Sequence, residues 1–544
     1  MAVAGPPELP FAPTIPNLIH AQAARFADRD FVVDQHQRLT YRDADTRSAA
    51  LAKQLVAAGV GKGTRVAMVF PSGVDFIVAF FALARIGAVA MPFSTLAMPP
   101  ELHTLLRQAD AQLLLTTATI AGHDMVARFE EAIPELSSTK GAPLYLPSVP
   151  MLRDVWIWNA EALPAWARGP ADIEVPEAVD DALLEEIESE VTPGDALCMV
   201  FTSGVTGEPK GALHCHGAFV RHSANLAPIQ GLLESDRLYT TMPMFWVGGI
   251  TVTTLALMHL GATVLCEERL DPPRTLDLIE RERATLVVGW QYAMTSLGED
   301  PSFPQRDLSS VRDGPLLTHI DPENTFVTIG TEVRHNSLGM TETSGPHTYA
   351  PPDMRSQVLP EKWLGSFGPP IPGVEHRIAD PVTGETLPDG VEGEVCVRGY
   401  SLMLGLNKRE RHEAFDRDGW YHTGDRGYFK DGLLFFKGRL TEMIKTKGAN
   451  VAPREVELVL EKFPEVRHAI VVGVPDPELG EEVVATIVLE EGATLDAEEL
   501  TSRAKRELAS YKVPRRVIFT ANSELPMTSS GKVDRRRLQA ELTT

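Results

Sequence analysis

Short apolar runs alternate with amphipathic stretches in the N-terminal part of the chain. Residues 41–58 have the pattern of a helix that ends at Gly59, and the apolar run RVAMVF (65–70) follows. A second helical stretch ends near residues 85–87 and leads to VAMPF (89–93). Short apolar strands between amphipathic helices are typical of crossover units around a buried, mostly parallel sheet. Further runs of this kind are ALCMVF (196–201), ATVLC (262–266) and TLVVG (285–289).

The pattern changes in three later regions. Residues 134–193 are rich in proline and acidic residues, which predicts surface excursions. After about Glu361, alternating apolar residues and Asp/Gly turns predict antiparallel strands or a small barrel. After residues 437–439, helices and strands alternate in a unit of roughly a hundred residues, a common domain size. Pro453 suits the first turn of a helix that runs to about Phe463.

These patterns predict an α/β protein with several domains, since 544 residues are too many for one hydrophobic core. Residues 1–438 would form a large N-terminal domain, and residues 439–544 a small α+β C-terminal domain. Within the large domain we expect two α/β sheet subdomains, at about 1–195 and 196–360, and a small β-barrel-like subdomain at 361–438.

Composition narrows the partners and the compartment. The chain has 51 basic and 74 acidic residues, and its net charge of −23 argues against nucleic acid or anionic membrane as the main partner. Its four cysteines are widely spaced, which argues against a metal cluster or a disulfide framework. No secretion-signal pattern opens the chain, and its longest apolar run (76–84) is too short to cross a bilayer. We expect a cytoplasmic protein without a transmembrane segment. A local exception to the acidic balance is the basic end, with Lys505, Arg506, Lys512, Arg515, Arg516, Lys532, Arg535, Arg536 and Arg537.

A loop rich in glycine and hydroxyl residues, FTSGVTGEPKG (201–211), follows the apolar run ALCMVF. It therefore lies at the carboxyl end of a predicted strand, where open α/β sheets bind ligands. Glycines let backbone N–H groups approach an anion closely, and hydroxyls add donors. The loop is not a Walker A motif, because Pro209 occupies its second glycine position and Gly211 follows Lys210. By itself it is consistent with either a turn or a phosphate site.

The full stretch resembles the phosphate loop of the adenylate-forming superfamily, which comprises acyl-CoA synthetases, adenylation domains of peptide synthetases and beetle luciferase. Further stretches resemble other motifs of that superfamily, in its order and roughly at its spacing. They are NSLGMTET (336–343), GWYHTGD (419–425), KGRLTEMIKTKGANVAPREVE (437–457) and LPMTSSGKVDRRRL (525–538). The resemblance covers essentially the whole chain and implies an acyl-CoA ligase that uses ATP, CoA and Mg²⁺.

The resemblance also implies individual roles. Glu342 would hold Mg²⁺ against the phosphates, and Thr341 would bond the α-phosphate. Asp425 would accept from both ribose hydroxyls, and Arg439 would support the nucleotide from the hinge side. Lys532 would neutralise charge between the carboxylate and the α-phosphate while the acyl-adenylate forms. The other implied nucleotide-binding positions are Thr202, Ser203, Gly204, Val205, Thr206, Gly207, Lys210 and Leu338.

Members of this superfamily rotate the C-terminal domain about a hinge between the two half-reactions, so a mobile small domain is implied here. The hinge would lie near residues 439–441 and include Thr441. After the rotation, Lys445, Gly448 and Ala449 would line the path of the CoA pantetheine.

The acyl pocket is implied around PMFWVGGITV (243–252), where many relatives have His in place of Trp246. Trp246 would either wall a large apolar acyl group or pack in the core. With Gly248, Gly339 and Met340 nearby by analogy, the expected substrate is a hydrophobic carboxylic acid, either fatty or aryl/polycyclic.

The sequence departs from the superfamily pattern in the ATP half-reaction. Val205 replaces a usual Ser or Thr, Leu338 replaces an aromatic residue beside adenine, and residues 311–326 lack the usual small-residue stretch. Thr441 stands where the hinge usually carries Asp or Lys. A lost hydrogen bond to a charged group is worth about 1.5–3 kcal/mol, and a lost stack about 0.5–1.5 kcal/mol. Two interpretations follow: tolerated drift, or a ligase that mainly converts a supplied acyl-adenylate to the thioester.

Two other functions stay open at this point. One is an acyl-AMP ligase that loads a carrier protein, and the other is a non-catalytic regulator that binds a nucleotide or CoA. A carboxylic acid and CoA are the expected small-molecule partners. A homodimer and a separate adenylating enzyme are further partner hypotheses.

Overall fold

In the computed structural model, the predicted helix at residues 41–58 is confirmed as α2 (Tyr41–Ala57). The hydroxyl oxygen of Thr40 caps its start by accepting a hydrogen bond from the backbone N–H of Asp43 at 3.0 Å. The helix ends just before Gly59, whose φ of 83° lies in the left-handed region that glycine adopts at little cost. The cap and the glycine thus set the two ends that the sequence indicates.

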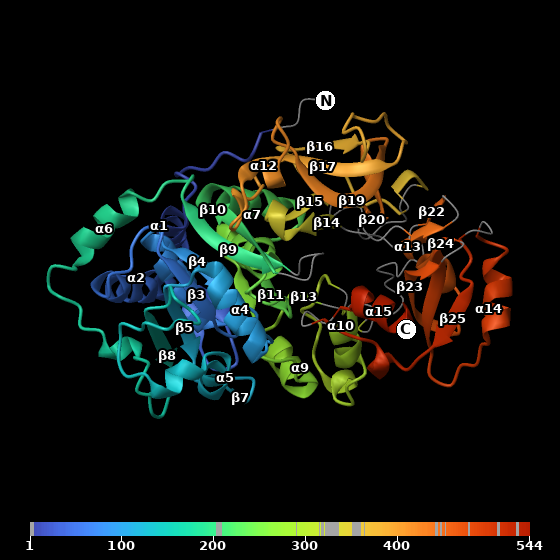
Figure 1. Ribbon diagram of the computed structural model, residues 1–544. Coiled ribbons are helices and arrows are strands. Elements are labelled where there is room, and N and C mark those ends of the chain that lie inside the picture. Colours follow the sequence, from blue (N-terminus) through green and yellow to red (C-terminus); the bar gives the residue numbers. More distant parts are fainter. Residues whose placement is uncertain are drawn as a thin grey trace.

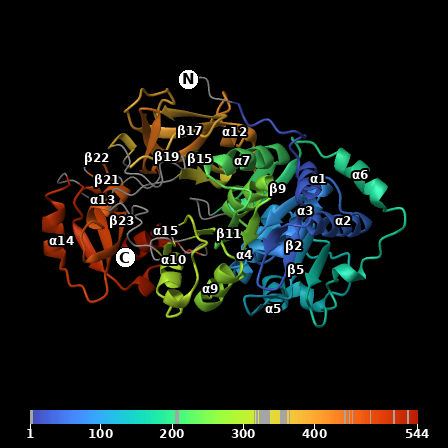
Figure 2. The same cartoon turned by 180° about the vertical axis from the view of Figure 1, so that it is seen from behind.

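The chain folds into a large body and a smaller C-terminal body (Figure 1). The view from behind shows the same separation (Figure 2). The structure describes residues 5–202, 209–289, 291–314, 316, 320, 337–350, 361–363, 365–440, 444–446, 449–451, 453–476, 479–508, 512–528 and 532–543.

A seven-stranded sheet in the large body contains the strands predicted at residues 65–70, 89–93 and 196–201. Five of its strands pair in parallel, and near one edge a single strand is antiparallel to both of its neighbours. In order across the sheet, the strands are β18 (Gly405–Leu406), β10 (Lys210–Cys215), β9 (Ala196–Thr202), β4 (Val89–Pro92), β3 (Arg65–Val69), β5 (Leu113–Thr117) and β8 (Asp154–Trp158).

A five-stranded sheet contains the strands predicted near residues 262–266 and 285–289. All neighbours in it are parallel except β2, which pairs antiparallel with β1. The strands in order are β13 (Leu286–Val288), β11 (Arg237–Thr240), β12 (Thr263–Leu265), β1 (Asp30–Val33) and β2 (Arg38–Thr40).

Helices fill the space between the two sheets and cover their outer faces. Residues alternate along each strand, so Val66 and Met68 of β3 join the core between the sheets, whereas Ala67 and Val69 join a second core. The helices between the sheets are α1 (Ile15–Phe26), α2, α3 (Val74–Arg85), α7 (His216–Ile229) and α8 (Ala256–Leu260). The outer faces carry α4 (Pro99–Ala109) and α5 (Met125–Ala132) on the larger sheet, and α9 (Pro272–Arg281) and α10 (Gln291–Gly298) on the smaller one.

The two sheets do not divide at residue 195, where we expected a boundary between subdomains. β1 and β2 pair into the sheet formed by residues 237–288, and β9 and β10 extend the sheet formed by β3, β4 and β5. Local periodicity predicts where a strand lies but not its partner, because pairing is decided by burial in the assembled fold.

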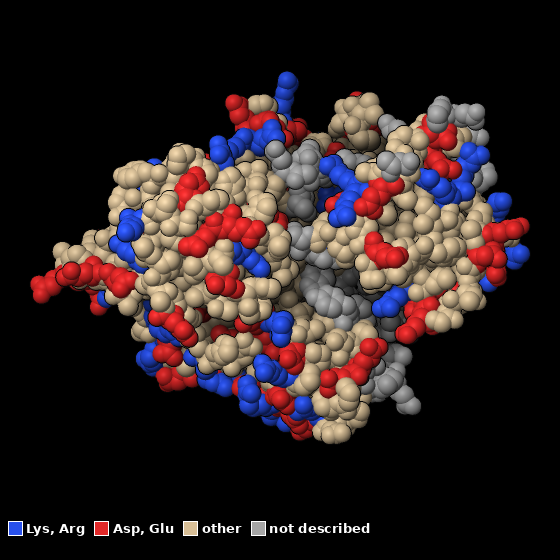
Figure 3. Space-filling view, turned by 60° about the horizontal axis from the view of Figure 1, so that its bottom comes forward, with Lys and Arg blue, Asp and Glu red and all other residues tan. Residues whose placement is uncertain are grey.

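The proline-rich region at residues 134–193 is also more ordered than we expected. β8 pairs in parallel with β5, and its Trp156 is fully buried. The Trp156 indole N–H donates to Asp154 Oδ2 at 2.8 Å, which satisfies its buried donor. Farther along, α6 (Asp181–Ser189) forms the surface excursion, and acidic side chains gather at the projecting end of the molecule at the left of Figure 3.

Antiparallel strands follow residue 361, as the alternating pattern predicts. Four of them form one sheet in the order β16 (Val374–Ala379), β17 (Gly393–Gly399), β19 (Tyr421–Lys430) and β20 (Leu433–Arg439). A separate hairpin, β14 (Ser337–Met340) and β15 (Gly345–Tyr349), lies beside this sheet, and the short helix α12 (Arg411–Ala414) follows β18.

The smaller body has its own cores. Two clusters of buried apolar residues contain only positions from Ile444 onward. The predicted helix at Pro453 is α13 (Pro453–Leu460), which ends three residues earlier than expected. The other elements are α14 (Ala497–Ala504), α15 (Arg535–Thr543) and a mixed sheet of β22 (Ala449–Val451), β21 (Ile444–Thr446), β24 (Gly480–Leu489), β23 (Val466–Asp476) and β25 (Arg516–Phe519). A body with separate cores supports the predicted domain boundary near residue 439, while its motion stays a prediction.

None of the helices in the described part of the chain combines the length and the apolar character needed to cross a membrane.

A buried charge cluster joins α1, α2, α3 and α6. Arg85 is 1% exposed and forms ion pairs with Asp45 and Glu188. His20 contacts the same two carboxylates, with its Nε2 at 2.6 Å from Glu188 Oε2 and its Nδ1 at 3.4 Å from Asp45 Oδ1. Hydrogen bonding to Asp45 and then to Glu188 raises the pKa of His20 from 6.5 to about 9. The protonated imidazole therefore ties the projecting helix α6 to the core of the large body.

The stabilisation from His20 should depend on pH. Because the folded-state pKa lies above the unfolded value of 6.5, the stabilisation is complete below pH 6.5 and is lost as the pH rises through about 9. Urea unfolding of the wild type and of His20→Gln should give free energies that differ most at low pH and converge above pH 9. The exposed residue His123 provides the control, and His123→Gln should show no such trend. A difference for His20→Gln that is constant with pH contradicts the assignment.

Candidate active site

The glycine-rich loop joins two antiparallel strands. Thr202 ends β9, Lys210 starts β10, and these two residues face each other across the ladder. Thr202 Oγ1 lies 3.5 Å from the Lys210 carbonyl oxygen. The predicted phosphate-binding residues Ser203, Gly204, Val205, Thr206 and Gly207 lie outside the described residues.

The second motif forms the hairpin of β14 and β15, with a 3₁₀ turn at Thr341–Thr343 between the strands. Gly339 is required where the strands approach, because a Cβ there would lie 2.5 Å from Pro346 Cα and 2.6 Å from the Gly345 carbonyl oxygen. The glycine thus sets the distance between the strands on either side of the Thr-Glu-Thr turn.

This turn is anchored at Ser344, a non-glycine residue with a φ of 61°. The Ser344 hydroxyl donates to the Ser401 carbonyl oxygen at 2.7 Å and accepts from His214 Nδ1 at 3.0 Å. Burial lowers the pKa of His214 to about 3, so the imidazole is neutral and donates from Nδ1. These bonds hold the turn against β10 and hold the Ser344 backbone in its left-handed conformation.

Glu342 lies in this turn and is 8% exposed. Its carboxylate lies close to the hydroxyl of Tyr421, the first residue of β19. Burial of the phenol, together with the nearby Glu342 charge, raises the pKa of Tyr421 well above its usual value. Tyr421 therefore stays protonated and joins the second motif to the third.

The third motif lies at a bulge in β19. Glu394 faces Arg426 and Cys396 faces His422 across β17 and β19, so the single residue Val395 lies opposite residues 423–425. The Thr423 hydroxyl donates to the Val395 carbonyl oxygen at 2.7 Å. It also accepts from the backbone N–H of Asp425 at 3.0 Å.

Asp425, predicted to bind ribose, is 3% exposed at this bulge. Its Oδ1 accepts from Arg439 Nε at 2.9 Å, and Arg439 Nη1 donates to the Thr423 carbonyl oxygen at 2.9 Å. Arg439 is the last residue of β20 and lies directly opposite Asp425. The arginine therefore holds the carboxylate in place from the end of the sheet that leads to the smaller body.

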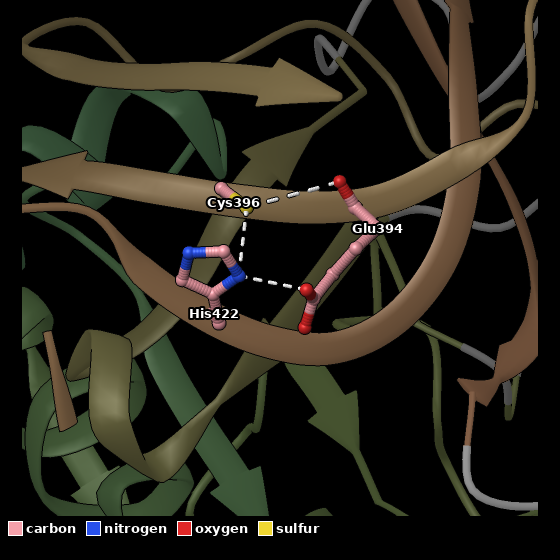
Figure 4. Close-up of side chains that lie close together, drawn as sticks. All are labelled: Glu394, Cys396 and His422. Atoms are coloured by element: carbon pink, nitrogen blue, oxygen red, sulfur yellow. Dashed lines mark hydrogen bonds and ion pairs between the residues drawn. The ribbon is translucent and has the colours of Figure 1, made fainter. Parts of the chain in front are cut away.

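Three side chains from β17 and β19 form a compact group, Glu394, Cys396 and His422 (Figure 4). His422 Nδ1 lies 2.7 Å from Glu394 Oε2 and 3.5 Å from Cys396 Sγ. Burial raises the pKa of the Cys396 thiol to about 12, and the residue is fully buried. The thiol is thus protonated and out of reach of a substrate, so this group is not a nucleophilic triad.

The predicted pocket residues lie in well-packed surroundings. Trp246 packs against the core between the two sheets, and its ring meets that of Phe245 nearly at a right angle, with centroids 5.2 Å apart. Gly248 follows at the start of a π-helix, η3 (Gly248–Leu255), a feature often found near functional sites. Leu338 packs against an apolar cluster with Val252 and Tyr349.

Met340 belongs to a different apolar cluster, which includes Ala212 of β10 and Tyr421. It connects the hairpin to the strand after the glycine-rich loop. Met340 and Leu338 are two residues apart and would share a face in a regular strand, but the register of β14 shifts between Leu338 and Gly339, and the two side chains have different neighbours.

Lys532, the predicted catalytic lysine, is exposed on the smaller body. Its backbone carbonyl oxygen accepts from the Thr528 backbone N–H at 2.7 Å, and Asp534 N–H donates to the Pro526 carbonyl oxygen at 2.8 Å. Within the described residues, no hydrogen bond or ion pair joins the Lys532 side chain to the large body. The structure therefore brings together Glu342, Asp425 and Arg439, but not the lysine.

The predicted CoA residues lie near the start of the smaller body. The backbones of Lys445 and Ala449 belong to the hairpin of β21 and β22. Gly448 and the hinge residue Thr441 lie outside the described residues, as does most of the segment at 311–326. On the face shown in Figure 3, the surface is hollowed between the two bodies, and charges of both signs lie around the hollow.

Sequence reasoning missed Tyr421, Thr423 and Glu394, although two of them stand inside the GWYHTGD motif. Their roles depend on contacts with distant residues. The one local signal for Glu394 is a charged residue within the apolar run of GEVCVRG.

The two bodies and the motifs that they carry have the arrangement of adenylate-forming enzymes. Residues 19–406 match the AMP-binding enzyme family, and residues 455–532 match the AMP-binding enzyme C-terminal domain. The chain belongs to the AMP-binding enzyme family and is an acid–thiol ligase of the acyl-CoA synthetase type.

Relatives and solved structures agree with this family. The chain is 32% identical over 530 residues to the indoleacetate–CoA ligase of Aromatoleum aromaticum, with 96% of each chain covered. It is 32% identical over 503 residues to a feruloyl-CoA synthase of Amycolatopsis sp, with 91% of this chain and 92% of the relative covered. The anthranilate CoA ligase AuaEII in complex with anthranoyl-AMP has the same fold, with a TM-score of 0.77, 21% identity and 98% of each chain covered.

The close approach at Gly339 gives a stability prediction. Gly339→Ala should lower the free energy of unfolding by about 1–3 kcal/mol, because the added methyl group meets backbone atoms of β15 that must move. Urea unfolding measures the change. A Cβ at Gly405 of β18 would have no heavy atom within 4 Å, so Gly405→Ala should stay within about 0.5 kcal/mol of the wild type. Equal effects of the two variants would contradict the packing argument.

Proposed function

We propose that this acyl-CoA ligase joins a hydrophobic carboxylic acid to CoA through an acyl-adenylate, with a rotation of the smaller body between the two half-reactions. The observation that carries the proposal is the link from Glu342 through Tyr421 to the bulge at Asp425. This link connects Glu342, a carboxylate suited to a metal–phosphate contact, with Asp425, a carboxylate suited to ribose hydroxyls, within the large body.

In the first half-reaction, a carboxylate oxygen of the acid attacks the α-phosphorus of ATP, and pyrophosphate leaves. Asp425 and Arg439 would hold the nucleoside, and Thr341 would donate to the α-phosphate. Lys532 would enter from the smaller body and offset the negative charge between the two anions that react. These roles suit a buried, fixed carboxylate in the large body and an exposed lysine on a separate one.

In the second half-reaction, the CoA sulfur attacks the acyl carbon, and AMP leaves as the C–S bond forms. The smaller body would first turn so that Lys532 withdraws and the β21–β22 hairpin approaches with Lys445 and Ala449. Separate cores in that body support a rigid turn about the segment after Arg439, because no apolar cluster would have to be broken.

Glu342 fits the role of a magnesium ligand. Its carboxylate is a hard oxygen donor, as Mg²⁺ requires, and the turn around it is held by the Ser344 and Tyr421 contacts. When bound, Mg²⁺ would reduce the negative charge of the phosphates. Tyr421, which lies close to the carboxylate, would help to orient it.

An aryl or fatty acid is the proposed substrate class. The relatives named for indoleacetate and ferulate support an aromatic acid, and the apolar residues Trp246 and Met340 would line its pocket. Free CoA is the proposed acceptor, since these relatives are CoA ligases.

A panel of acids tests the function. Incubated with ATP, Mg²⁺ and CoA, the wild type should form acyl-CoA from indoleacetate, ferulate or a fatty acid faster than from acetate, as followed by mass spectrometry. Lys532→Ala should lower acyl-AMP formation by at least about a hundredfold, as expected for lost charge stabilisation. Thioester formation from pre-made acyl-AMP should fall much less.

Preference for acetate or an amino acid contradicts the substrate class. Transfer to a phosphopantetheinylated carrier protein but not to CoA would identify a carrier-loading ligase. Absence of turnover with both acceptors and all acids would point to a regulator.

The departures at Val205 and Leu338 support a second, narrower proposal: the adenylation half-reaction is weak, and the chain also accepts supplied acyl-adenylates. Leu338 lies within an apolar cluster, so its packing is maintained without an aromatic ring. Val205 lacks a hydroxyl where the polyphosphate would lie.

Restoring that hydroxyl should strengthen the first half-reaction. Val205→Thr should raise kcat/KM for ATP in ATP–pyrophosphate exchange by about 10–100-fold, the equivalent of one hydrogen bond to a charged group. Its rate of thioester formation from pre-made acyl-AMP should match that of the wild type, which serves as the control reaction. Robust exchange by the wild type at ordinary ATP concentration, unchanged in Val205→Thr, would refute weak adenylation.

A further inference from the structure

The bulge that carries Asp425 lacks part of the regular strand ladder. One residue of β17 lies opposite three of β19, so the backbone groups of residues 423–425 cannot all pair with β17. Gly424, in the middle, has a φ of 71°. Because glycine resists such conformations least, its own backbone does little to fix the peptide that leads to Asp425.

Glu394 supplies the missing contact. Its Oε1 accepts from the Gly424 backbone N–H at 3.0 Å, and a carboxylate acceptor makes this bond stronger than a ladder bond to a neutral carbonyl. The residue is the second of β17, and its side chain is only 12% exposed. The peptide before Asp425 is therefore held by a buried side chain rather than by the neighbouring strand.

The same carboxylate is held from its other oxygen. His422 Nδ1 lies 2.7 Å from Glu394 Oε2, and Figure 4 shows the two side chains pointing toward each other. The other ring nitrogen of His422, Nε2, lies 3.5 Å from Asp416 Oδ2. With contacts on both oxygens, Glu394 has a single orientation, and so has the Gly424 N–H that it binds.

The contacts favour a hydrogen-bonded group over a metal site, although ligand atoms of Glu394, Cys396 and His422 all lie within 4.8 Å of one another. The separation of 2.7 Å between His422 Nδ1 and Glu394 Oε2 is that of a hydrogen bond. Nitrogen and oxygen ligands of tetrahedral zinc, with bonds of about 2.0–2.2 Å, lie about 3.3 Å apart.

We propose that Glu394 is a positioning residue for nucleotide recognition: it holds the Gly424 peptide so that the Asp425 carboxylate faces the ribose. This inference rests on the proposed role of Asp425 in binding the nucleotide. It adds that the selectivity for the ribose hydroxyls depends on a residue that does not touch the nucleotide.

Binding of AMP and of 2′-deoxy-AMP tests the inference without requiring turnover. Isothermal titration calorimetry of the wild type should show that AMP binds at least about tenfold tighter than 2′-deoxy-AMP, since the deoxy ligand lacks one hydroxyl that donates to a carboxylate. The ratio of the two dissociation constants is the quantity compared among variants. Glu394→Ala should reduce this ratio to less than about threefold. A purely structural loss would weaken both ligands alike and leave the ratio unchanged.

Further variants separate the contribution of the Gly424 hydrogen bond from that of the His422 contact. Glu394→Gln keeps an acceptor for the Gly424 N–H and should keep most of the ratio. Glu394→Asp is one methylene too short to reach both Gly424 and His422, so its ratio should fall; it replaces Glu394→Ala if that variant does not fold. The matched control is Glu392, which lies just before β17 and forms an ion pair with Arg426 Nη2 at 2.5 Å. Glu392→Gln should keep the full ratio.

Asp425→Asn distinguishes failure of this inference from failure of the proposed nucleotide site. If Asp425→Asn lowers the ratio while Glu394→Ala and Glu394→Asp keep it, the positioning role is wrong. If Asp425→Asn also keeps the ratio, Asp425 does not read the ribose, and Glu394 has no such carboxylate to position.

Discussion

The hydrogen bonds that replace the broken ladder between β17 and β19 fix Asp425, and the rest of the site is arranged around that carboxylate. Thr423 bridges the two strands, Glu394 holds Gly424, and Arg439 binds Asp425 from β20. In a regular strand, successive side chains point to opposite faces of the sheet at a fixed spacing. The bulge frees Asp425 from that spacing, and buried polar contacts then restore its position.

The predicted site residues lie on two separate bodies of the molecule. Within the large body, Glu342 and Asp425 are connected through Tyr421 by buried contacts, which suits residues that must keep their separation. Lys532 and the β21–β22 hairpin instead belong to a body with its own apolar cores. A fixed pair of carboxylates and a lysine on a separate body suit a reaction in two steps. The large body can keep the nucleotide in place while the smaller body changes which of its residues face the site.

The sequence was informative where the determinant is local. The periodicity around α2 and the apolar run of β3 predicted those elements, and motif order predicted the family. It failed where long-range contacts decide the outcome. The local sequence pattern does not predict that β1 pairs with β12, so the predicted subdomain boundary at residue 195 was misplaced. Glu394 was missed for the same reason: its role arises only because β19 has two more residues than β17 at the bulge.

The interleaved sheets also constrain how the chain is made. On the ribosome, β1 emerges long before its parallel neighbour, since Val32 pairs with Val264. At about 5–20 residues per second, the delay is on the order of 10–50 seconds. Throughout that time α1, α2 and α3 lack one of the two sheets between which they are finally buried. Apolar surface of the nascent N-terminal third therefore stays exposed until the strands at residues 237–288 have been made.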